Sequence, residues 1–272
     1  MSEPAGTVMF TIATSGYLPF VLNLHASLAR LGLGESLLVY ALDDESHAEL
    51  NAAGVRSHRF GLADYRATSP FRSEDFARIM ACKYGAALEI LAANRNALYV
   101  DSDIVFLRDP TDELHRRLAG SDADLLMQFE TPKNVFNAGF WLARPRPGVV
   151  TLFERLGEAC RSGGDDQDLL NQWQSEGPGV SIEPLDAELF ACGNQFLGGL
   201  PVEQGGFSID RSKRPFPYRE AYLLHFNYLI GEETKVRAMA QHGGIFHSLL
   251  AARTGGILFR LRRLLDRIRT GR

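Results

Sequence analysis

The chain has 272 residues, of which 45% are hydrophobic and 23% charged, a composition typical of soluble globular proteins and sufficient for one sizeable α/β core. The net charge of −4 gives no overall attraction to nucleic acid, so no nucleic-acid partner is expected. No apolar run is long enough to cross a bilayer, the N-terminus lacks the pattern of a signal peptide, and three isolated cysteines argue against disulfides and structural zinc, so we expect a cytoplasmic protein.

The first hundred residues alternate between strand-like and helix-like segments. The predicted strands are residues 7–13, 36–42 and 55–60, and the predicted helices are residues 19–31, 74–94 and the segment that "DDES" at 43–46 begins. Residues 96–107, "NALYVDSDIVFL", resemble one nearly continuous buried strand. The alternation predicts a doubly wound, mostly parallel central sheet flanked by helices, in which ligands bind beyond the carboxyl ends of the strands.

The second half of the chain is less regular. Strands are predicted at residues 124–129 and 138–144 and a helix at about 149–160, followed by an acidic segment at 163–173. Residues 191–218 are rich in glycine and aromatic residues and lack periodicity. Long irregular segments in compact domains are often functional, so we expect this segment to form a wall of the substrate site, on the side of any acceptor, or a lid. Because no linker interrupts the chain, residues 1–250 are predicted to form one domain.

Residues 251–272 form a basic tail, with seven arginines against one acid between Arg253 and Arg272. Its apolar residues fall on one helical stripe, which predicts a basic amphipathic C-terminal helix. Such a helix can lie on an anionic membrane surface, which would place the protein on the inner face of the membrane. The alternative is a terminal helix that docks on the domain with its arginines in solvent.

Two carboxylates, Asp101 and Asp103, follow the buried run "LYV". On a turn that leaves a strand, both can bind one hard divalent cation, with substrate phosphates completing its ligand shell. Taken alone, the pair could equally be solvated turn residues. Two phosphate chemistries use such a pair: nucleotide-sugar transfer, and phosphoryl transfer through an aspartyl phosphate with Asp101 as the nucleophile, as in haloacid dehalogenase-like hydrolases. In those hydrolases the nucleophile usually lies on the first strand, whereas three predicted strands precede Asp101.

A second motif, "LHFNYLIGEETKV", contains His225, Gly231 and Lys235. A neutral imidazole can add a metal ligand, a glycine lets the backbone approach a phosphate, and a lysine brings a compact positive charge to a diphosphate. His225 alone is more simply interpreted as a core histidine. The ordered set of three residues, far downstream of the two aspartates, favours the phosphate site.

Four segments in order, "LYVDSDIVFLRDP", "FNAGFWLARP", "DDQDLLNQW" and "HFNYLIGEETK", resemble the nucleotide-diphospho-sugar transferases of the GT-A fold. The resemblance runs from about residue 7 to 245 and is strongest to the retaining families. These include bacterial galactosyltransferases of lipopolysaccharide assembly and plant wall xylosyl- and arabinosyltransferases. It implies a glycosyltransferase that uses a nucleotide-sugar donor, with a UDP-sugar as the first candidate, and a glycan, lipid-linked or other hydroxyl acceptor.

The resemblance also implies roles for individual residues. Asp101, Asp103 and His225 would bind Mn²⁺ or Mg²⁺. The donor would contact Thr11, Ala13, Thr14, Lys83, Asp101, Ser102, Asn137, Gly139, Gly231 and Lys235. Thr11–Thr14 would line the base and ribose, while the Gly231 backbone and Lys235 would hold the diphosphate. Lys83 could instead be a solvated helix charge.

Asp166 and Gln167 would lie against the reacting carbon. Retention requires either a covalent intermediate, for which Asp166 is the candidate nucleophile, or front-face attack, in which the Gln167 amide oxygen would stabilise the sugar cation. Neighbouring Asp165 is expected only to begin a helix, where an acid is favoured. A non-catalytic nucleotide-sugar binding protein is a third possibility beside the transferase and the phosphatase.

Overall fold

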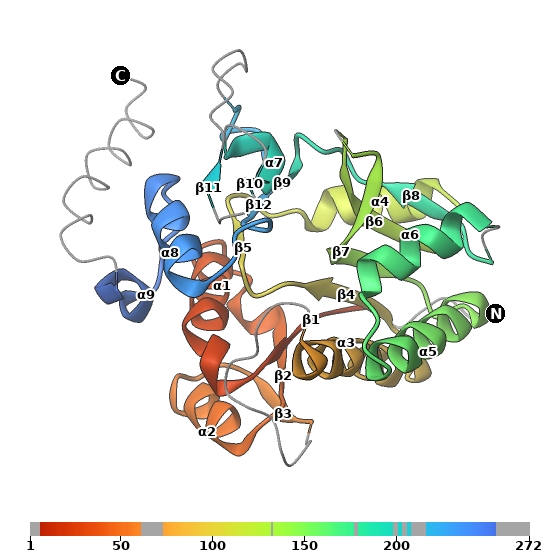
Figure 1. Cartoon of the computed structure of the whole chain (residues 1–272), viewed down its shortest axis with the longest axis horizontal. Coiled ribbons are helices and arrows are strands. Elements are labelled where there is room, and N and C mark those ends of the chain that lie inside the picture. Colours follow the sequence, from red (N-terminus) through yellow and green to blue (C-terminus); the bar gives the residue numbers. More distant parts are fainter. Residues whose placement is uncertain are drawn as a thin grey trace.

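The computed structural model describes residues 6–60, 73–131, 133–176, 179–197, 201–202, 206–207 and 216–253. A seven-stranded sheet crosses the molecule in the order β3-β2-β1-β4-β7-β6-β8 (Figure 1). Its strands are β1 (Thr7–Ala13), β2 (Leu37–Ala41), β3 (Ser57–Arg59), β4 (Asn96–Val100), β6 (Leu125–Glu130), β7 (Val135–Ala143) and β8 (Ile182–Pro184). Only β7 runs antiparallel to its neighbours in this sheet, which confirms the predicted mostly parallel α/β architecture.

Helices cover both faces of this sheet. One face carries α1 (Leu18–Ala29), α2 (Asp44–Ala52) and α4 (Thr111–Gly120), and the other carries α3 (Glu74–Ala92), α5 (Pro147–Arg161) and α6 (Asp166–Glu176) (Figure 1). Successive side chains of a strand point to opposite faces of the sheet. In β1, Met9 packs into the apolar core on the side of α1, α2 and α4, and its neighbour Phe10 packs into the core on the side of α3, α5 and α6. The sequence therefore places apolar residues on both sides of the central strands.

Side-chain caps begin two of these helices. The Asp43 carboxylate accepts a hydrogen bond from the Ser46 backbone N–H at 2.7 Å and starts α2. The Ser73 hydroxyl accepts one from the Phe76 N–H at 3.1 Å and starts α3. Both residues are short polar side chains of the kind that satisfies the unpaired N–H groups at a helix start.

Residues 96–107 do not form one strand, so this prediction is wrong. β4 ends at Val100, a turn follows at residues 101–103, and the chain enters β5 (Ile104–Phe106) in a second sheet. The Asp101 N–H donates to the Gly139 carbonyl at 2.8 Å, and the Asp101 carbonyl then accepts from the Ile104 N–H at 3.1 Å, which closes the turn. Aspartate and serine favour turns because their side chains compete for local backbone groups.

The second sheet has three strands in the order β5-β12-β9, with β12 (Leu223–His225) in the middle and β9 (Phe190–Cys192) at its far edge. A third apolar cluster covers it, with residues from α7 (Gly193–Phe196), α8 (Glu232–Gln241) and α9 (Ser248–Arg253). Two-residue strands β10 (Pro201–Val202) and β11 (Gly206–Phe207) pair as a small antiparallel ladder. The expected wall or lid at 191–218 is thus described only in part and remains a prediction.

The predicted basic helix lies largely in residues 254–272, outside the described residues. Helix α9 spans the expected domain boundary at residue 250, and Leu250 packs into the third cluster. The boundary itself remains a prediction. Within the described part of the chain, no helix is both long and apolar enough to span a bilayer. The three cysteines are buried and form no disulfide.

Candidate metal and donor site

Asp101, Asp103 and His225 meet where the two sheets join. Both aspartates lie in the turn between β4 and β5, on either side of the half-buried Ser102, and His225 ends β12, where it pairs with Ile104. The His225 Nε2 atom lies 3.5 Å from Asp101 Oδ2 and 3.2 Å from Asp103 Oδ1. One ligand atom from each of the three residues lies within 4.8 Å of the others. The imidazole therefore faces the aspartates, as a shared cation requires.

Cationic side chains of the protein already stand beside Asp103. The Lys235 ammonium contacts Asp103 Oδ2 while His225 contacts Oδ1. Burial alone would raise the pKa of Asp103, but these two neighbours outweigh it and hold the pKa well below its usual range. Burial lowers the pKa of His225, yet Asp103 and Asp101 raise it well above 6.5. Two carboxylates and an imidazole that attract positive charge this strongly form a donor set that suits a divalent cation.

Gly139 explains how closely the chain packs at this site. A Cβ atom at this position would lie 2.3 Å from Asp101 Oδ2 and 2.4 Å from His225 Cε1. The pairing of β6 with β7 shifts here: Met127 faces Trp141, but Gln128 faces Asn137, so residues 138–140 leave the register. Only glycine lets the displaced backbone run against the metal ligands.

Asn137 holds this displaced backbone and links it to a buried acid. Its Oδ1 accepts from the Gly139 N–H at 2.8 Å, and its Nδ2 donates to Glu130 Oε1 at 2.7 Å. Glu130 is fully buried, and its Oε2 has no hydrogen-bond partner among the described residues. Burial raises the pKa of Glu130 against the opposing effect of the Asn137 hydrogen bond. Glu130 was not predicted from the sequence, although it ends a buried strand much as Asp101 follows one.

Lys83 and Asp166 form a buried pair beside Ala138, the residue before Gly139. The Lys83 ammonium contacts Asp166 Oδ2 and donates to the Ala138 carbonyl at 3.2 Å, and the Tyr84 hydroxyl donates to the same Asp166 oxygen at 2.9 Å. Burial would lower the pKa of Lys83, but Asp166 and Asp101 raise it above its usual value. Lys83 is 2% exposed, so the alternative of a solvated helix charge is wrong.

Tyr99 joins the pair of Lys83 and Asp166 to the metal ligand Asp101. The Tyr99 hydroxyl donates to Asp101 Oδ1 at 2.7 Å, and its ring centre lies 4.9 Å from the Lys83 ammonium. Gln167 Oε1 accepts from the Ala138 N–H at 3.2 Å. Asp165 accepts from the Asp168 N–H at 3.1 Å, as expected of a residue that begins α6. The contact of Tyr99 with Asp101 was not predicted, because an aromatic residue in an apolar run resembles an ordinary core residue.

The residues predicted to contact the nucleotide lie at the edge of the sheet beside Asp101. β1 pairs with β4 in the register Phe10 to Tyr99, so Thr11 lies level with Val100 at the end of β4, and Ala13 and Thr14 continue past it. All three side chains are buried. The Thr11 hydroxyl has no hydrogen-bond partner in the part of the chain that is described. Their contact with base and ribose remains a prediction.

Gly231 and Lys235 lie at the start of α8. Gly231 is the residue before the helix and has φ of 87°, a conformation that glycine adopts without strain. Lys235 lies one turn into the helix, and its N–H donates to the Gly231 carbonyl at 3.2 Å. A helix start with an adjacent lysine suits an anionic group such as a diphosphate.

The protein family of this chain follows from a match along most of its sequence. The family model for nucleotide-diphospho-sugar transferases matches residues 32–239. The chain belongs to this family. As a nucleotide-diphospho-sugar transferase it is a glycosyltransferase, and the haloacid dehalogenase-like alternative is not supported. No curated protein matches the chain by sequence.

Solved structures share the fold of this nucleotide-diphospho-sugar transferase at low identity. Mouse xyloside xylosyltransferase 1, in its apo form, is 13% identical with a TM-score of 0.50, over 82% of this chain and 98% of that one. The apo bifunctional glycosyltransferase WbbM is 10% identical with a TM-score of 0.50, over 88% and 50%. GlyE of Streptococcus pneumoniae TIGR4 is 16% identical with a TM-score of 0.48, over 69% and 46%. The chain thus spans about half the length of GlyE and WbbM, and the two likenesses with a TM-score of 0.50 establish the fold alone.

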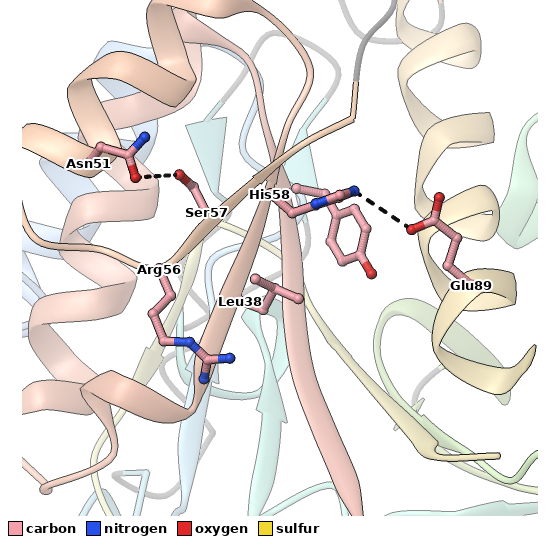
Figure 2. Close-up of a pocket in the computed structure, with 7 residues that line it drawn as sticks. Leu38, Asn51, Arg56, Ser57, His58 and Glu89 are labelled. Atoms are coloured by element: carbon pink, nitrogen blue, oxygen red, sulfur yellow. Dashed lines mark hydrogen bonds and ion pairs between the residues drawn. The ribbon is translucent and has the colours of Figure 1, made fainter. Parts of the chain in front are cut away.

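A pocket of about 460 Å³ lies away from this site in the transferase (Figure 2). Its walls come from β2, β3 and the neighbouring helices, and Arg56, His58 and Glu89 line it. The His58 Nε2 atom lies 3.9 Å from Glu89 Oε2, and both side chains are about half exposed. None of the candidate site residues lines this pocket.

Proposed function

We propose that this protein transfers a sugar from a nucleoside-diphosphate donor, with UDP as the first candidate nucleotide, to a hydroxyl acceptor, with Mn²⁺ or Mg²⁺ bound by Asp101, Asp103 and His225. The observation that carries the proposal is the convergence of three ligand atoms within 4.8 Å at the carboxyl end of β4. Ligands of open α/β sheets bind at this edge. The family match supports the donor class, and the chemistry of the three side chains supports the divalent cation.

The reaction breaks the bond between the anomeric carbon and the diphosphate oxygen, which leaves with the electron pair while the sugar becomes oxocarbenium-like. When bound, the cation supplies Lewis-acid stabilisation of the departing diphosphate. Lys235 adds a second positive charge, and its contact with Asp103 places it within reach of the same groups. The start of α8 at Gly231 offers backbone N–H groups to phosphate oxygens. No general acid is then needed for the leaving group.

Asp166 and Gln167 support retention of the anomeric configuration by different routes. In the covalent route Asp166 would attack the anomeric carbon, and in the front-face route the Gln167 amide oxygen would stabilise the cation. Asp166 Oδ2 accepts from both Lys83 and Tyr84, so Oδ1 is the oxygen that would attack in the covalent route. Gln167 Oε1 accepts from the Ala138 N–H and has a second lone pair for the cation in the front-face route. Mass spectrometry of a trapped glycosyl-enzyme would identify the covalent route instead.

For the acceptor side we propose the segment at 191–218 as a wall or lid and the basic tail at 251–272 as a membrane contact. A lipid-linked acceptor would suit a chain that binds an anionic membrane surface through this tail. Flotation with anionic vesicles tests the tail, by comparing the full chain with a chain that ends at Thr254. Equal flotation of the two chains would remove the membrane proposal and leave the transferase proposal intact.

The test of the transferase proposal is slow donor hydrolysis. The protein is incubated with a panel of nucleotide sugars, with and without Mn²⁺, and release of nucleoside diphosphate is measured. We expect metal-dependent release that falls by roughly two orders of magnitude or more in Asp103→Asn and His225→Ala. Asp112→Asn, an exposed acid in the first turn of α4, is the matched control and should leave the rate unchanged. Binding of donors without any turnover would favour a non-catalytic protein, and the product anomer, read by NMR, tests retention.

A further inference from the structure

Gln128 is a buried polar residue in β6, whose other residues are apolar except for Glu130 at its end. It lies in β6 with no exposed surface, next to the shift in pairing between β6 and β7. Irregular pairing of this kind re-aims side chains and recurs beside active sites. Burying an amide without hydrogen bonds is unfavourable, so the partners of Gln128 decide whether it serves the core or the site.

Both ends of the Gln128 amide have partners in the second sheet. Its Nε2 donates to the Phe190 carbonyl of β9 at 3.0 Å, and its Oε1 lies 2.8 Å from His225 Nδ1. A carbonyl oxygen can only accept, so the NH₂ group must face Phe190 and the amide oxygen must face the imidazole. An oxygen at hydrogen-bond distance from Nδ1 requires that this nitrogen carry a proton.

The consequence concerns the other ring nitrogen of His225. A cation binds the neutral imidazole, and with the proton held on Nδ1 that form has its lone pair on Nε2, the atom that faces Asp101 and Asp103. Metal-binding histidines are oriented in this way by an acceptor on the opposite nitrogen. Without that acceptor, a proton on Nε2 could bind Asp103 and leave no lone pair for a cation.

We propose that Gln128 is a positioning residue of the metal site, which holds His225 in the Nδ1–H form and presents its Nε2 lone pair between the two aspartates. This inference rests on the proposed function, because it assumes that His225 is a metal ligand. Gln128 does not itself touch the donor or the cation. It acts through the imidazole, and its second hydrogen bond anchors it to Phe190.

The test compares Gln128→Met, which keeps the length of the side chain without either hydrogen bond, with Gln128→Glu, which keeps an acceptor for Nδ1. Mn²⁺ affinity is measured by calorimetry without donor. The Nδ1–H resonance of His225 is measured by NMR in metal-free, ¹⁵N-histidine-labelled protein and assigned by its loss in His225→Ala. We expect roughly 10–100-fold weaker Mn²⁺ binding and a fast-exchanging Nδ1 proton in Gln128→Met. Gln128→Glu should keep the slowly exchanging proton and lose less affinity.

Met127→Leu is the matched control, because Met127 precedes Gln128, is equally buried and packs on the opposite face of the sheet. It should bind Mn²⁺ as the unsubstituted protein does, and circular dichroism checks that each variant is folded. Unchanged Mn²⁺ affinity in Gln128→Met, or an unsubstituted protein whose His225 carries no Nδ1 proton, would overturn the role of Gln128 alone. Failure of the unsubstituted protein to bind Mn²⁺ would overturn the proposed metal site and this role together.

Discussion

The ammonium of Lys83 contacts Asp166 Oδ2, which joins the middle of α3 to the first residue of α6. The Lys83 side chain is 2% exposed and that of Asp166 is 10% exposed, so the pair lies almost wholly out of water. A buried pair of this kind gains little net stability over apolar residues, but removal of one partner leaves an uncompensated charge. We infer that the pair is kept for function.

Lys83→Met should therefore destabilise the fold by about 3–5 kcal/mol, because Asp166 would keep only the Tyr84 hydroxyl as a strong partner. The double variant Lys83→Met with Asp166→Leu should recover a large part of this loss without recovering donor hydrolysis. Urea unfolding of the three proteins measures the difference. A double variant as unstable as the single one would contradict the uncompensated charge as the cause.

Gly139→Ala should weaken Mn²⁺ binding, because the added Cβ would lie 2.3 Å from Asp101 Oδ2 and must displace a metal ligand. We expect an accompanying loss of unfolding free energy of about 1–3 kcal/mol from overpacking. Gly120→Ala, at the end of α4 with no atom within 4 Å of the new Cβ, is the control and should leave both quantities nearly unchanged. Calorimetry with Mn²⁺ decides the matter, and equal affinity in both variants would argue against the close packing described here.

Lys235→Met should separate cation binding from donor binding. The Lys235 ammonium occupies Asp103 Oδ2, so its removal should leave Mn²⁺ affinity equal or higher when no donor is present. Affinity for UDP in the presence of Mn²⁺ should fall roughly 10–100-fold, because a charge-assisted hydrogen bond to the diphosphate is lost. Arg237→Met, two residues further along α8 and paired with Glu233 at the surface, is the control. Weaker Mn²⁺ binding in Lys235→Met would show that the lysine supports the cation instead of competing with it.

His242 should make stability depend on pH. Burial lowers the pKa of His242 from 6.5 to about 4, and its Nδ1 lies 2.5 Å from the Tyr218 hydroxyl. Because the folded-state pKa is depressed, the contribution is fully present above pH 6.5 and is lost as pH falls toward 4. The loss is at most about 3 kcal/mol, since one unit of pKa corresponds to about 1.4 kcal/mol.

The check is urea unfolding between pH 7 and pH 4. His242→Asn keeps an acceptor for Tyr218 but does not titrate in this range, so its unfolding free energy should fall less over this interval than that of the unsubstituted protein. His115→Asn changes an exposed histidine of α4 and should follow the unsubstituted protein. Parallel curves for all three proteins would assign the acid sensitivity to other groups.

The sequence predicted the order of elements well but not where one sheet passes into the next. β1 was predicted with its observed bounds, since its apolar run is closed by the turn after Ala13. The run at 96–107 was misjudged because two strands of different sheets, both fully buried, carry the same apolar pattern on either side of the turn. Nothing in a hydrophobic run records the direction that the chain takes after it.

The residues of the candidate site were also predicted only in part. Asp101, Asp103 and His225 were predicted as a set because their residue types and order match one chemistry, and the structure brings them together. Gln128 and Glu130 were missed because a single polar residue at a strand position has no partner at a fixed spacing. The burial of Lys83 was uncertain because its partner, Asp166, lies far along the chain, and periodicity within α3 does not report it.

The seven strands of the central sheet are complete at Pro184, whereas His225 and Lys235 come later in the chain. A ribosome therefore finishes every strand of the sheet, and both aspartates, before it adds the imidazole and the ammonium. Proteolysis or premature termination between Pro184 and His225 would leave a product with all seven strands that lacks the proposed imidazole ligand and the proposed diphosphate lysine. The candidate cation site is therefore complete only once the growing chain has passed His225.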